Sequence, residues 1–474
     1  MASHATTVLL VPFIVVAALT LFFHSPVLVL VLIGIPNNMN NSDKSRSSKA
    51  VSVHSWYDFA GYLGLLAFSH SIVLYLATSI RLYGGHVFNP MSLWLDGGWA
   101  VLVDDVKGHF VEAFVWYASF IAYEMLLALI LPGVVVKGLA LANGEHLVYN
   151  CNALAAWYVT LITVAVLQLS GIWSISRLTD YYYSLVLVTM LAADLTAVYM
   201  WLTGWLAGKS TGQGQLADFV MGTWLNPRLF GGRLDLKMFF EVRVSWILLF
   251  LLTLSCAVKN GLTGGMFVIL TAHFLYANSC VKGEECIPTT WDIFKEKWGW
   301  MLIYWNLCGV PFVYCFSSWF ILKNPQYTLQ PWQTGALLGV LFCAYYVFDT
   351  ANAQKSHFRN PNLPARKGAF PQFEYGRLDH PKVLKTHCGT DLLIDGWYKY
   401  ARKVHYAADW TMAGVWALSC GTVSCLLPFV HWMFFTCMII QRYFRDDARC
   451  QQKYGKDWDR YCQIVPYIFI PGLI

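Results

Sequence analysis

The fold is decided by apolar segments such as Leu185-Val-Leu-Val-Thr-Met-Leu-Ala-Ala-Asp-Leu-Thr-Ala-Val-Tyr-Met-Trp-Leu-Thr-Gly-Trp-Leu206, in which Asp194 is the one charged residue. A helix needs about 20 apolar residues to cross a hydrocarbon core of about 30 Å. Such segments recur along a chain of 474 residues that is 57% hydrophobic and 13% charged. Because backbone groups in lipid must be satisfied within the segment, we expect an all-α, polytopic membrane helical bundle.

The other expected spans are 8–35, 57–80, 114–136, 154–173, 246–258, 266–280, 300–322, 336–348 and 410–440. The total is about nine to eleven transmembrane helices. Segment 8–35 is longer than a signal-peptide core, so we expect a retained first helix. Pro428 lies in the middle of 410–440, and because proline lacks a backbone N–H we expect two shorter helices or a tight hairpin there.

The basic residues of this chain, whose net charge is +6, collect at 44–49, 355–385 and 442–456. By the positive-inside rule we expect these segments to face the cytosol. None resembles a nucleic-acid-binding arm, so no nucleic-acid partner is expected. Thirteen Cys at irregular spacings indicate neither a disulfide framework nor a zinc site, and no metal is expected.

Two polar insertions, 208–243 and 354–399, interrupt the apolar pattern. The second is basic and too long for a simple turn. Both are candidate surfaces for a cofactor or for substrate access. No Gly-x-Gly-x-x-Gly motif opens a strand–helix unit, so any nicotinamide cofactor must be held by another architecture.

Ionisable residues at bilayer depth cost about 2.5–3.5 kcal/mol on insertion scales, so each is a candidate functional residue. Glu124, Asp194, His273 and Asp409 qualify. For any one of them taken alone, a satisfied interhelical hydrogen bond is the simpler explanation. Glu284 and Glu285 lie at the end of an expected span, where a solvated pair is as credible as a functional one.

The last quarter of the chain carries the densest polar motifs. In Asp349-Thr-Ala-Asn-Ala-Gln-Lys355-Ser-His-Phe-Arg359, the two cations are four residues apart and share one face of a helix. Two cations at a membrane exit suit phosphate groups. The blocks 392–409 and 445–461 then interleave aromatic, basic and acidic residues, which a simple basic tail would not need.

At these residues the chain resembles the sterol reductase family, which includes delta-14 and delta-7 sterol reductases and the reductase-like part of the lamin B receptor. The resemblance runs from about Trp56 to Ile474. It rests on Leu131-Pro-Gly133, Leu225-Asn-Pro-Arg228, Asp235-Leu-Lys-Met-Phe-Phe-Glu-Val-Arg243 and Lys453-Tyr-Gly-Lys-Asp-Trp458.

One block separates the branches of the family. Delta-14 and delta-7 members carry Gly-Trp-Trp-Gly-x-Ala-Arg-His-x-Asn-Tyr-x-Gly-Asp, whereas this chain has Gly396-Trp-Tyr-Lys-Tyr-Ala-Arg-Lys-Val-His-Tyr-Ala-Ala-Asp409. Tyr398 replaces a Trp and His405 replaces an Asn. The block is similar to that of the delta-24(24(1))-sterol reductases, which complete ergosterol-type sterols by reducing the side chain.

The resemblance implies NADPH as cofactor, bound between the C-terminal helices. The residues implied to bind it are Lys355, Arg359, Leu393, Tyr398, His405, Tyr406, Asp446, Cys450, Lys453, Tyr454 and Tyr461. An isolated alkene cannot accept hydride directly, so protonation must come first. The candidate proton donors are Tyr406, Asp409 and Glu285. Burial favours a neutral carboxyl donor, whereas nearby Arg402 opposes it at Asp409, so Tyr406 stays an alternative.

We divide the chain into an N-terminal extension with one candidate helix (1–52), an N-terminal membrane bundle (53–265) and a C-terminal catalytic half with the NADPH and sterol pocket (266–474). The expected location is the endoplasmic reticulum membrane. Expected partners are a sterol from the bilayer, membrane lipids and other enzymes of the sterol pathway. The alternatives are a delta-14 or delta-7 ring reductase, a non-catalytic sterol-binding scaffold, and a transporter, for which internal repeats are missing.

Overall fold

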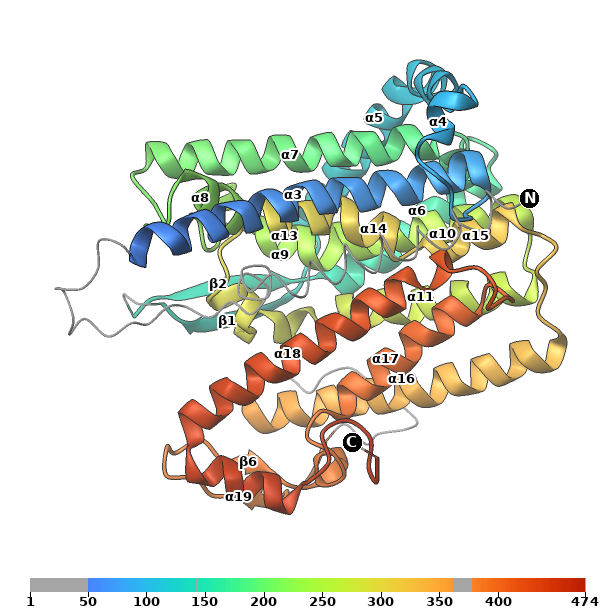
Figure 1. Ribbon diagram of the computed structural model, residues 1–474. Coiled ribbons are helices and arrows are strands. Elements are labelled where there is room, and N and C mark those ends of the chain that lie inside the picture. The colour runs from blue at the N-terminus through green and yellow to red at the C-terminus, as the bar shows by residue number, and fades with distance from the viewer. Residues whose placement is uncertain (1–49, 142–143, 362–376, 474) are drawn as a thin grey trace.

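The computed structural model describes residues 50–141, 144–361 and 377–473, and its helices run roughly side by side (Figure 1). Within these ranges, seven helical stretches are long and apolar enough to cross a membrane. They are α3 (Ala50–Tyr83, from Asp58), α5 (Gly98–Ile130), α7 (Tyr182–Leu206), α9 to α10 (Leu236–Asn260), α11 (Gly264–Lys282), α13 to α15 (Trp300–Lys323) and α16 (Pro331–Arg359). The expected all-α, multi-pass membrane bundle is confirmed.

Three further helices complete the bundle, namely α6 (Ala153–Leu169), α17 (Val404–Leu418) and α18 (Val430–Tyr454). Helices α6 and α17, with 17 and 15 residues, are shorter than a full span of about 20. The second half of α18 is strongly charged. For these reasons seven stretches qualify by length and composition, against the expected nine to eleven. The expected first span, 8–35, lies outside the described residues.

Helix α10 (Ser245–Asn260) lies at the centre of the bundle. It packs against α11, α14 (Val310–Val313), α15 (Phe316–Lys323) and the short helix η1 (Ile175–Thr179). Its Leu248, Leu249 and Leu252 are fully buried. By contrast, only 28% of the apolar window of α16 is buried, compared with 78% in the stretch that contains α10. The buried core therefore lies around α10, and α16 lies at its edge.

The break expected at Pro428 is confirmed. Helices α17 and α18 are joined through the short helix η6 (Leu427–Phe429), and both pack against it. Helix α16 packs closely along α17 (Figure 1). These three helices form the layer that carries the C-terminal segments. The boundary placed between residues 265 and 266 stays a prediction.

One expected span is wrong at its end. Residues 134–136 lie not in a helix but in strand β1 (Val134–Ala140), which pairs antiparallel with β2 (His146–Cys151). Helix α5 stops at Ile130 because Pro132 cannot donate a backbone hydrogen bond and disfavours a helical residue before it. The three β-branched valines that follow suit a strand.

Two shorter hairpins complete the described strands. Strand β3 (Arg228–Leu229) pairs with β4 (Leu234–Asp235), and β5 (Val383–Leu384) pairs with β6 (Leu392–Leu393). Helix α8 (Gln215–Met221) precedes the first hairpin, and α19 (Lys456–Ile464) closes the chain. Both hairpins lie in segments expected to be polar insertions.

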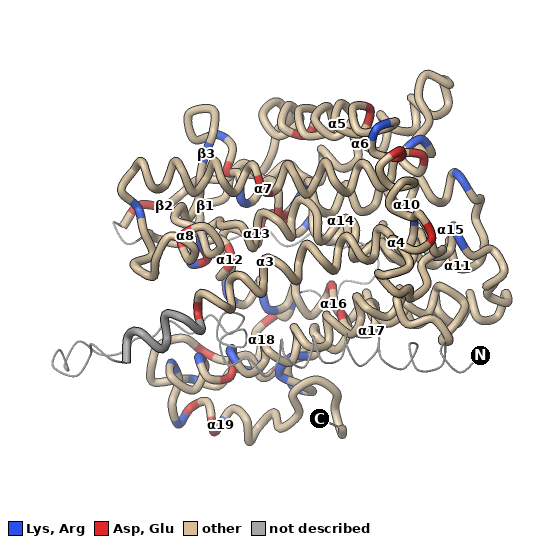
Figure 2. The backbone as a smooth tube through the Cα atoms, turned by 45° about the horizontal axis from the view of Figure 1, so that its top comes forward, with Lys and Arg blue, Asp and Glu red and all other residues tan. Residues whose placement is uncertain are grey.

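The expected polar insertion 208–243 is also wrong at its end, because α9 (Leu236–Met238) and the π-helix η2 (Phe239–Val244) continue directly into α10. The charges that suggested a connector are satisfied inside the protein. Lys237 Nζ donates to the carbonyl groups of residues 292, 293 and 296 at 2.6, 2.9 and 2.7 Å. Arg243 donates to Glu284 at 2.9 Å and to Asn152. Figure 2 shows that most charged residues nevertheless gather near the ends of the helices.

The ion pair between Arg243 and Glu284 predicts a stability effect. Both side chains are 3% exposed, so Arg243→Leu leaves a buried carboxylate without its partner. We expect a loss of about 3–5 kcal/mol in the free energy of unfolding. The matched control is Lys259→Gln, which removes an exposed pair with Asp180 and is expected to cost at most about 1 kcal/mol. Equilibrium unfolding in mixed micelles measures both, and equal effects of the two substitutions would contradict the assignment.

Candidate active site

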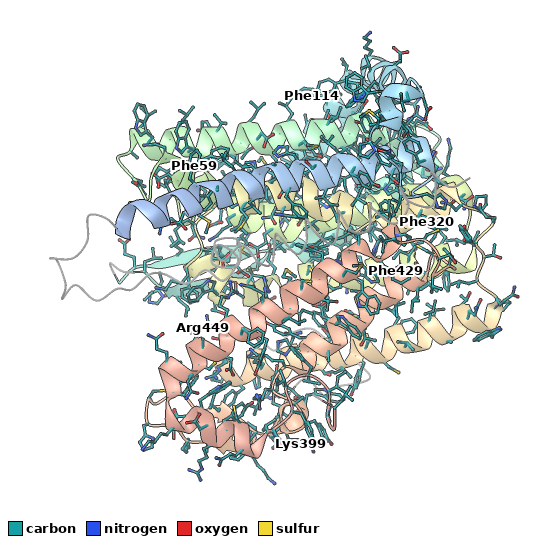
Figure 3. All side chains as sticks on the ribbon, viewed as in Figure 1. Phe59, Phe114, Phe320, Lys399, Phe429 and Arg449 are labelled. Carbon is teal, nitrogen blue, oxygen red and sulfur yellow. The ribbon has the colours of Figure 1, made fainter. Side chains whose placement is uncertain are left out.

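A cavity of about 90 Å³ lies where the end of α16 meets the C-terminal segments. It brings together residues from four separate parts of the last quarter of the chain. The predicted cofactor residues that line it are Lys355, Arg359, Leu393, Tyr398, Cys450, Tyr454 and Tyr461. Phe358, Leu392, Arg402, Lys403 and Trp458 complete the lining. Side chains crowd this end of the molecule, between the labelled Arg449 and Lys399 (Figure 3).

The two cations of α16, Lys355 and Arg359, both line this cavity. Residues 355 and 359 lie in the last two turns of one helix, and both line the cavity. The Lys355 ammonium also lies 5.8 Å from the centroid of the Tyr398 ring. The Tyr398 ring also lines the cavity. The spacing of four residues therefore places two positive charges on one surface.

The wall opposite α16 is held together by its own small core. Leu384, Leu392, Trp458, Tyr461 and Val465 pack into one buried cluster that joins the β5–β6 hairpin to α19. The cluster fixes the aromatic side of the cavity. It also explains why the block 445–461 needs aromatic residues among its charges.

Hydrogen bonds lock this wall in place. Arg402 Nη1 donates to the carbonyl groups of Val465 and Pro466 at 2.6 and 3.0 Å. Asp457 accepts hydrogen bonds from the backbone N–H of His387 at 2.8 Å and from its Nδ1 at 2.9 Å. These two bonds hold the pKa of Asp457 below its usual range. Arg402 thus mainly holds residues 465 and 466 in place. Other cations of the cavity are therefore left to bind a ligand.

Lys403, which lines the cavity, forms an ion pair with Asp446. Their charged atoms lie 2.7 Å apart, and Arg449 lies 3.5 Å from the other oxygen of the carboxylate. Burial alone would lower the pKa of Lys403, but the negative charge of Asp446 outweighs it, and the pKa is raised. Lys403 therefore stays charged. Because Asp446 neutralises Lys403, the cations left for an anionic ligand are Lys355 and Arg359.

Four predicted cofactor residues, namely His405, Tyr406, Asp446 and Lys453, lie outside the lining of the cavity. The Tyr398 hydroxyl donates to the carbonyl of Ala351 at 3.2 Å and lies 3.4 Å from His405 Nδ1. The rings of His405 and Tyr406 are 4.5 Å apart. His405 and Tyr406 thus support Tyr398 and the start of α17, and Asp446 supports Lys403. Lys453 is exposed, with its ammonium 4.9 Å from the centroid of the Tyr454 ring.

Asp409 lies one turn after Tyr406 on α17 and faces a different helix. The Tyr276 hydroxyl on α11 lies 3.4 Å from Asp409 Oδ2. The Tyr276 ring is surrounded by Trp246, Trp416 and Phe348, with centroid distances of 4.8, 5.2 and 6.0 Å. An acid and a hydroxyl are thereby paired among aromatic rings. The sequence did not single out Tyr276, because this residue lies in an apolar span. Only its contact with Asp409 in the folded protein distinguishes it from the other residues of that span.

Glu285, the third expected proton donor, belongs to the short helix η3 (Glu284–Thr289). Burial raises the pKa of the Cys151 thiol on β2, and the charges of Glu284 and Glu285 add to this shift. Helix η3 packs against both strands of the β1–β2 hairpin. The next residue, Cys286, lies 3.1 Å from Ser356 on α16, measured between Sγ and Oγ. The structure thus associates Glu285 with β2 and η3, whereas Tyr406 and Asp409 share α17.

No group of three or more His, Cys, Asp or Glu side chains in the described ranges could hold a metal ion. The polar groups of the site are instead cations, one paired acid and several tyrosine hydroxyls. Such a set can bind an anionic, planar ligand and can hold a proton beside an apolar space.

Comparison with known proteins identifies the family of this chain. The profile of the Ergosterol biosynthesis ERG4/ERG24 family matches residues 53–474. The Delta(24(24(1)))-sterol reductase erg4A of Aspergillus fumigatus is 40% identical over 374 residues, which cover 76% of this chain and 79% of that protein. The Delta(24(24(1)))-sterol reductase of Gibberella zeae is 40% identical over 380 residues, covering 77% of this chain and 63% of that protein.

Ring reductases match as well. The Delta(14)-sterol reductase of Dictyostelium discoideum is 32% identical over 452 residues, which cover 89% of this chain and 93% of that protein. The fold and these matches define a membrane-embedded oxidoreductase of sterol biosynthesis. The chain belongs to the ERG4/ERG24 family of sterol reductases.

Proposed function

We propose that this chain is an NADPH-dependent delta-24(24(1))-sterol reductase of the endoplasmic reticulum membrane. It would reduce the 24(28) double bond of the sterol side chain, the final step towards an ergosterol-type sterol. The observation that carries the proposal is the cation-lined cavity of Lys355 and Arg359 at the end of α16, which packs along the helix that carries Asp409, the partner of Tyr276. The 40% identity to two side-chain reductases supports the choice of substrate.

The residues of the cavity fit a phosphate-bearing nicotinamide cofactor. Lys355 and Arg359 offer charge-assisted hydrogen bonds to phosphate, and an Arg fork suits phosphate oxygens. Tyr398, Tyr454 and Tyr461 offer flat faces for rings. The volume of about 90 Å³ is below the roughly 300–1,000 Å³ of complete ligand pockets, so the cavity accommodates one end of the dinucleotide.

Bound NADPH supplies hydride to a carbon that already carries positive charge. The protein must therefore first protonate the alkene. We assign this step to Asp409, with Tyr276 holding and orienting its carboxyl group through their contact at 3.4 Å. The proton goes to the terminal methylene carbon, so that the charge develops on the tertiary carbon 24. Tyr406, one turn before Asp409, is the alternative donor.

The aromatic side chains around Tyr276 suit this chemistry in two ways. Trp246, Phe348 and Trp416 exclude water, which would otherwise capture the cation. The faces of their rings also stabilise a nearby positive charge. We infer that the sterol side chain lies against these rings, with its polar end elsewhere in the bilayer.

A ring reductase is the second candidate. The delta-14 reductase of Dictyostelium discoideum matches a larger share of the chain than the side-chain reductases do, although at lower identity. Tyr398 and His405 argue against this reading, because both depart from the block of the ring-reducing members. A sterol-binding scaffold would have no use for two cations facing one cavity.

Product analysis tests the proposal directly. Membranes that contain the chain are incubated with NADPH and either a 24(28)-methylene sterol or a delta-14 sterol, and the products are identified by gas chromatography and mass spectrometry. We expect loss of the methylene group and an unchanged delta-14 bond. Loss of the delta-14 bond would instead assign the chain to ring reduction.

Substitution of the two cations tests the cofactor site. Each charge-assisted hydrogen bond is worth about 1.5–3 kcal/mol, so Lys355→Ala and Arg359→Ala should raise the KM for NADPH by roughly tenfold to a hundredfold. Binding of the sterol should change little. Lys399→Ala is the matched control, because this lysine is exposed and lies outside the cavity lining. An equal loss of cofactor and sterol binding in the Lys355 or Arg359 variants would contradict the assignment.

A further inference from the structure

A second cavity lies at the end of α5, between the β1–β2 and β3–β4 hairpins. We call it the hairpin cavity and define it by Ala128, Val135, Val148, Asn150, Arg228 and Arg233. Its volume of about 380 Å³ falls within the range of small-ligand sites. A smaller recess, which shares Arg228 and Arg233, continues inward to Arg243 and Glu284. None of these residues lines the cofactor cavity.

The hairpin cavity and its recess carry an excess of positive charge. Arg228, Arg233 and Arg243 face them, together with the carboxylates of Asp235 and Glu284. Both carboxylates are already engaged by backbone N–H groups at helix starts, at 3.0 and 2.6 Å respectively. Each is also paired with one arginine. The third arginine, Arg233, has no carboxylate partner among the described residues.

Two of these arginines, at the recess, have guanidinium nitrogens that find no hydrogen-bond acceptor among the described residues. Arg243 is 3% exposed, and its Nη1 has no hydrogen-bond partner among the described residues. Nη2 of Arg228 also has no hydrogen-bond partner among the described residues. The guanidinium of Arg228 lies 4.5 Å from the centroid of the Tyr149 ring. A buried donor without an acceptor is unfavourable, so an anionic ligand with several oxygen atoms would be stabilised here.

The surroundings of the hairpin cavity are apolar and exposed. Ile130, Val135, Val148 and Phe230 are 62%, 67%, 48% and 54% exposed. Ile130 ends the apolar part of α5, so these side chains lie where a membrane-spanning segment stops. Phe230 also has a φ of 53°, which is rare for a bulky residue and is found at functional sites. A ligand at this place meets cations on one side and hydrocarbon on the other.

We propose that the hairpin cavity binds the phosphate-bearing headgroup of an anionic membrane lipid. Arg233 contacts the phosphate at the mouth, and Arg228 and Arg243 supply donors further in. The acyl chains lie along the exposed apolar side chains at the end of α5. A free phosphate compound shares the headgroup chemistry, but it would gain nothing from the apolar surroundings.

The test measures lipid binding to the full chain purified in detergent. Dioleoyl phosphatidic acid and dioleoyl phosphatidylcholine are titrated separately, and bound lipid is counted by native mass spectrometry. We expect phosphatidic acid to bind at least tenfold more tightly. Arg233→Gln should weaken its binding about tenfold, the loss expected for one charge-assisted hydrogen bond. Arg233→Lys should retain most of the affinity, because it keeps the charge.

The matched control is Arg177→Gln, an exposed arginine beyond the other end of α6, which should bind phosphatidic acid like the unchanged protein. Equal binding of the two lipids would overturn the proposal. So would equal effects of Arg233→Gln and Arg177→Gln, or equal losses in Arg233→Gln and Arg233→Lys. Competition by millimolar inorganic phosphate that fully displaces the lipid would assign the cavity to a soluble phosphate instead.

Discussion

Charges inside the apolar helices must be neutralised by the protein itself, and the rest of the structure depends on how this is done. Arg243 pairs with Glu284, and Lys237 donates to three backbone carbonyls. Lys282 on α11 and Asp349 on α16 lie 2.5 Å apart and are largely buried. A buried charge that loses its partner is strongly unfavourable, so each pair fixes the helices that carry it. The pair of Lys282 and Asp349 sets the position of α16 against the core.

The position of α16 decides where the candidate cofactor cavity lies. Helix α16 carries Lys355 and Arg359 to the cavity at its end, and α17 packs along it with Asp409. Helix α11 contributes both the anchor Lys282 and the partner of Asp409, Tyr276. Helix α16 thus carries the two cations of the cavity, and α17 and α11, which both pack against α16, hold the paired acid. In the proposed reaction the cavity binds the cofactor and the acid protonates the alkene before hydride arrives.

Patterns among neighbouring residues predicted the structural features that are set by residues close together in the sequence. Apolar length predicted the seven stretches that qualify as spans but extended one of them into β1, and Pro428 predicted the break between α17 and α18. The spacing of Lys355 and Arg359 predicted one cationic helix face. Patterns failed where partners are distant in the chain, since Tyr276 meets Asp409 only in space. Residues 236–243 read as a polar connector because the groups that satisfy Lys237 and Arg243 lie more than 40 positions away.

The central claim is that protonation at the terminal methylene carbon precedes hydride transfer to carbon 24. The most direct measurement is the location of deuterium in the reduced sterol by mass spectrometry, using either NADPH deuterated at its transferable position or D₂O as solvent. We expect cofactor deuterium at carbon 24 and solvent deuterium in the new methyl group. Cofactor deuterium in the methyl group, or none in the sterol, would contradict it.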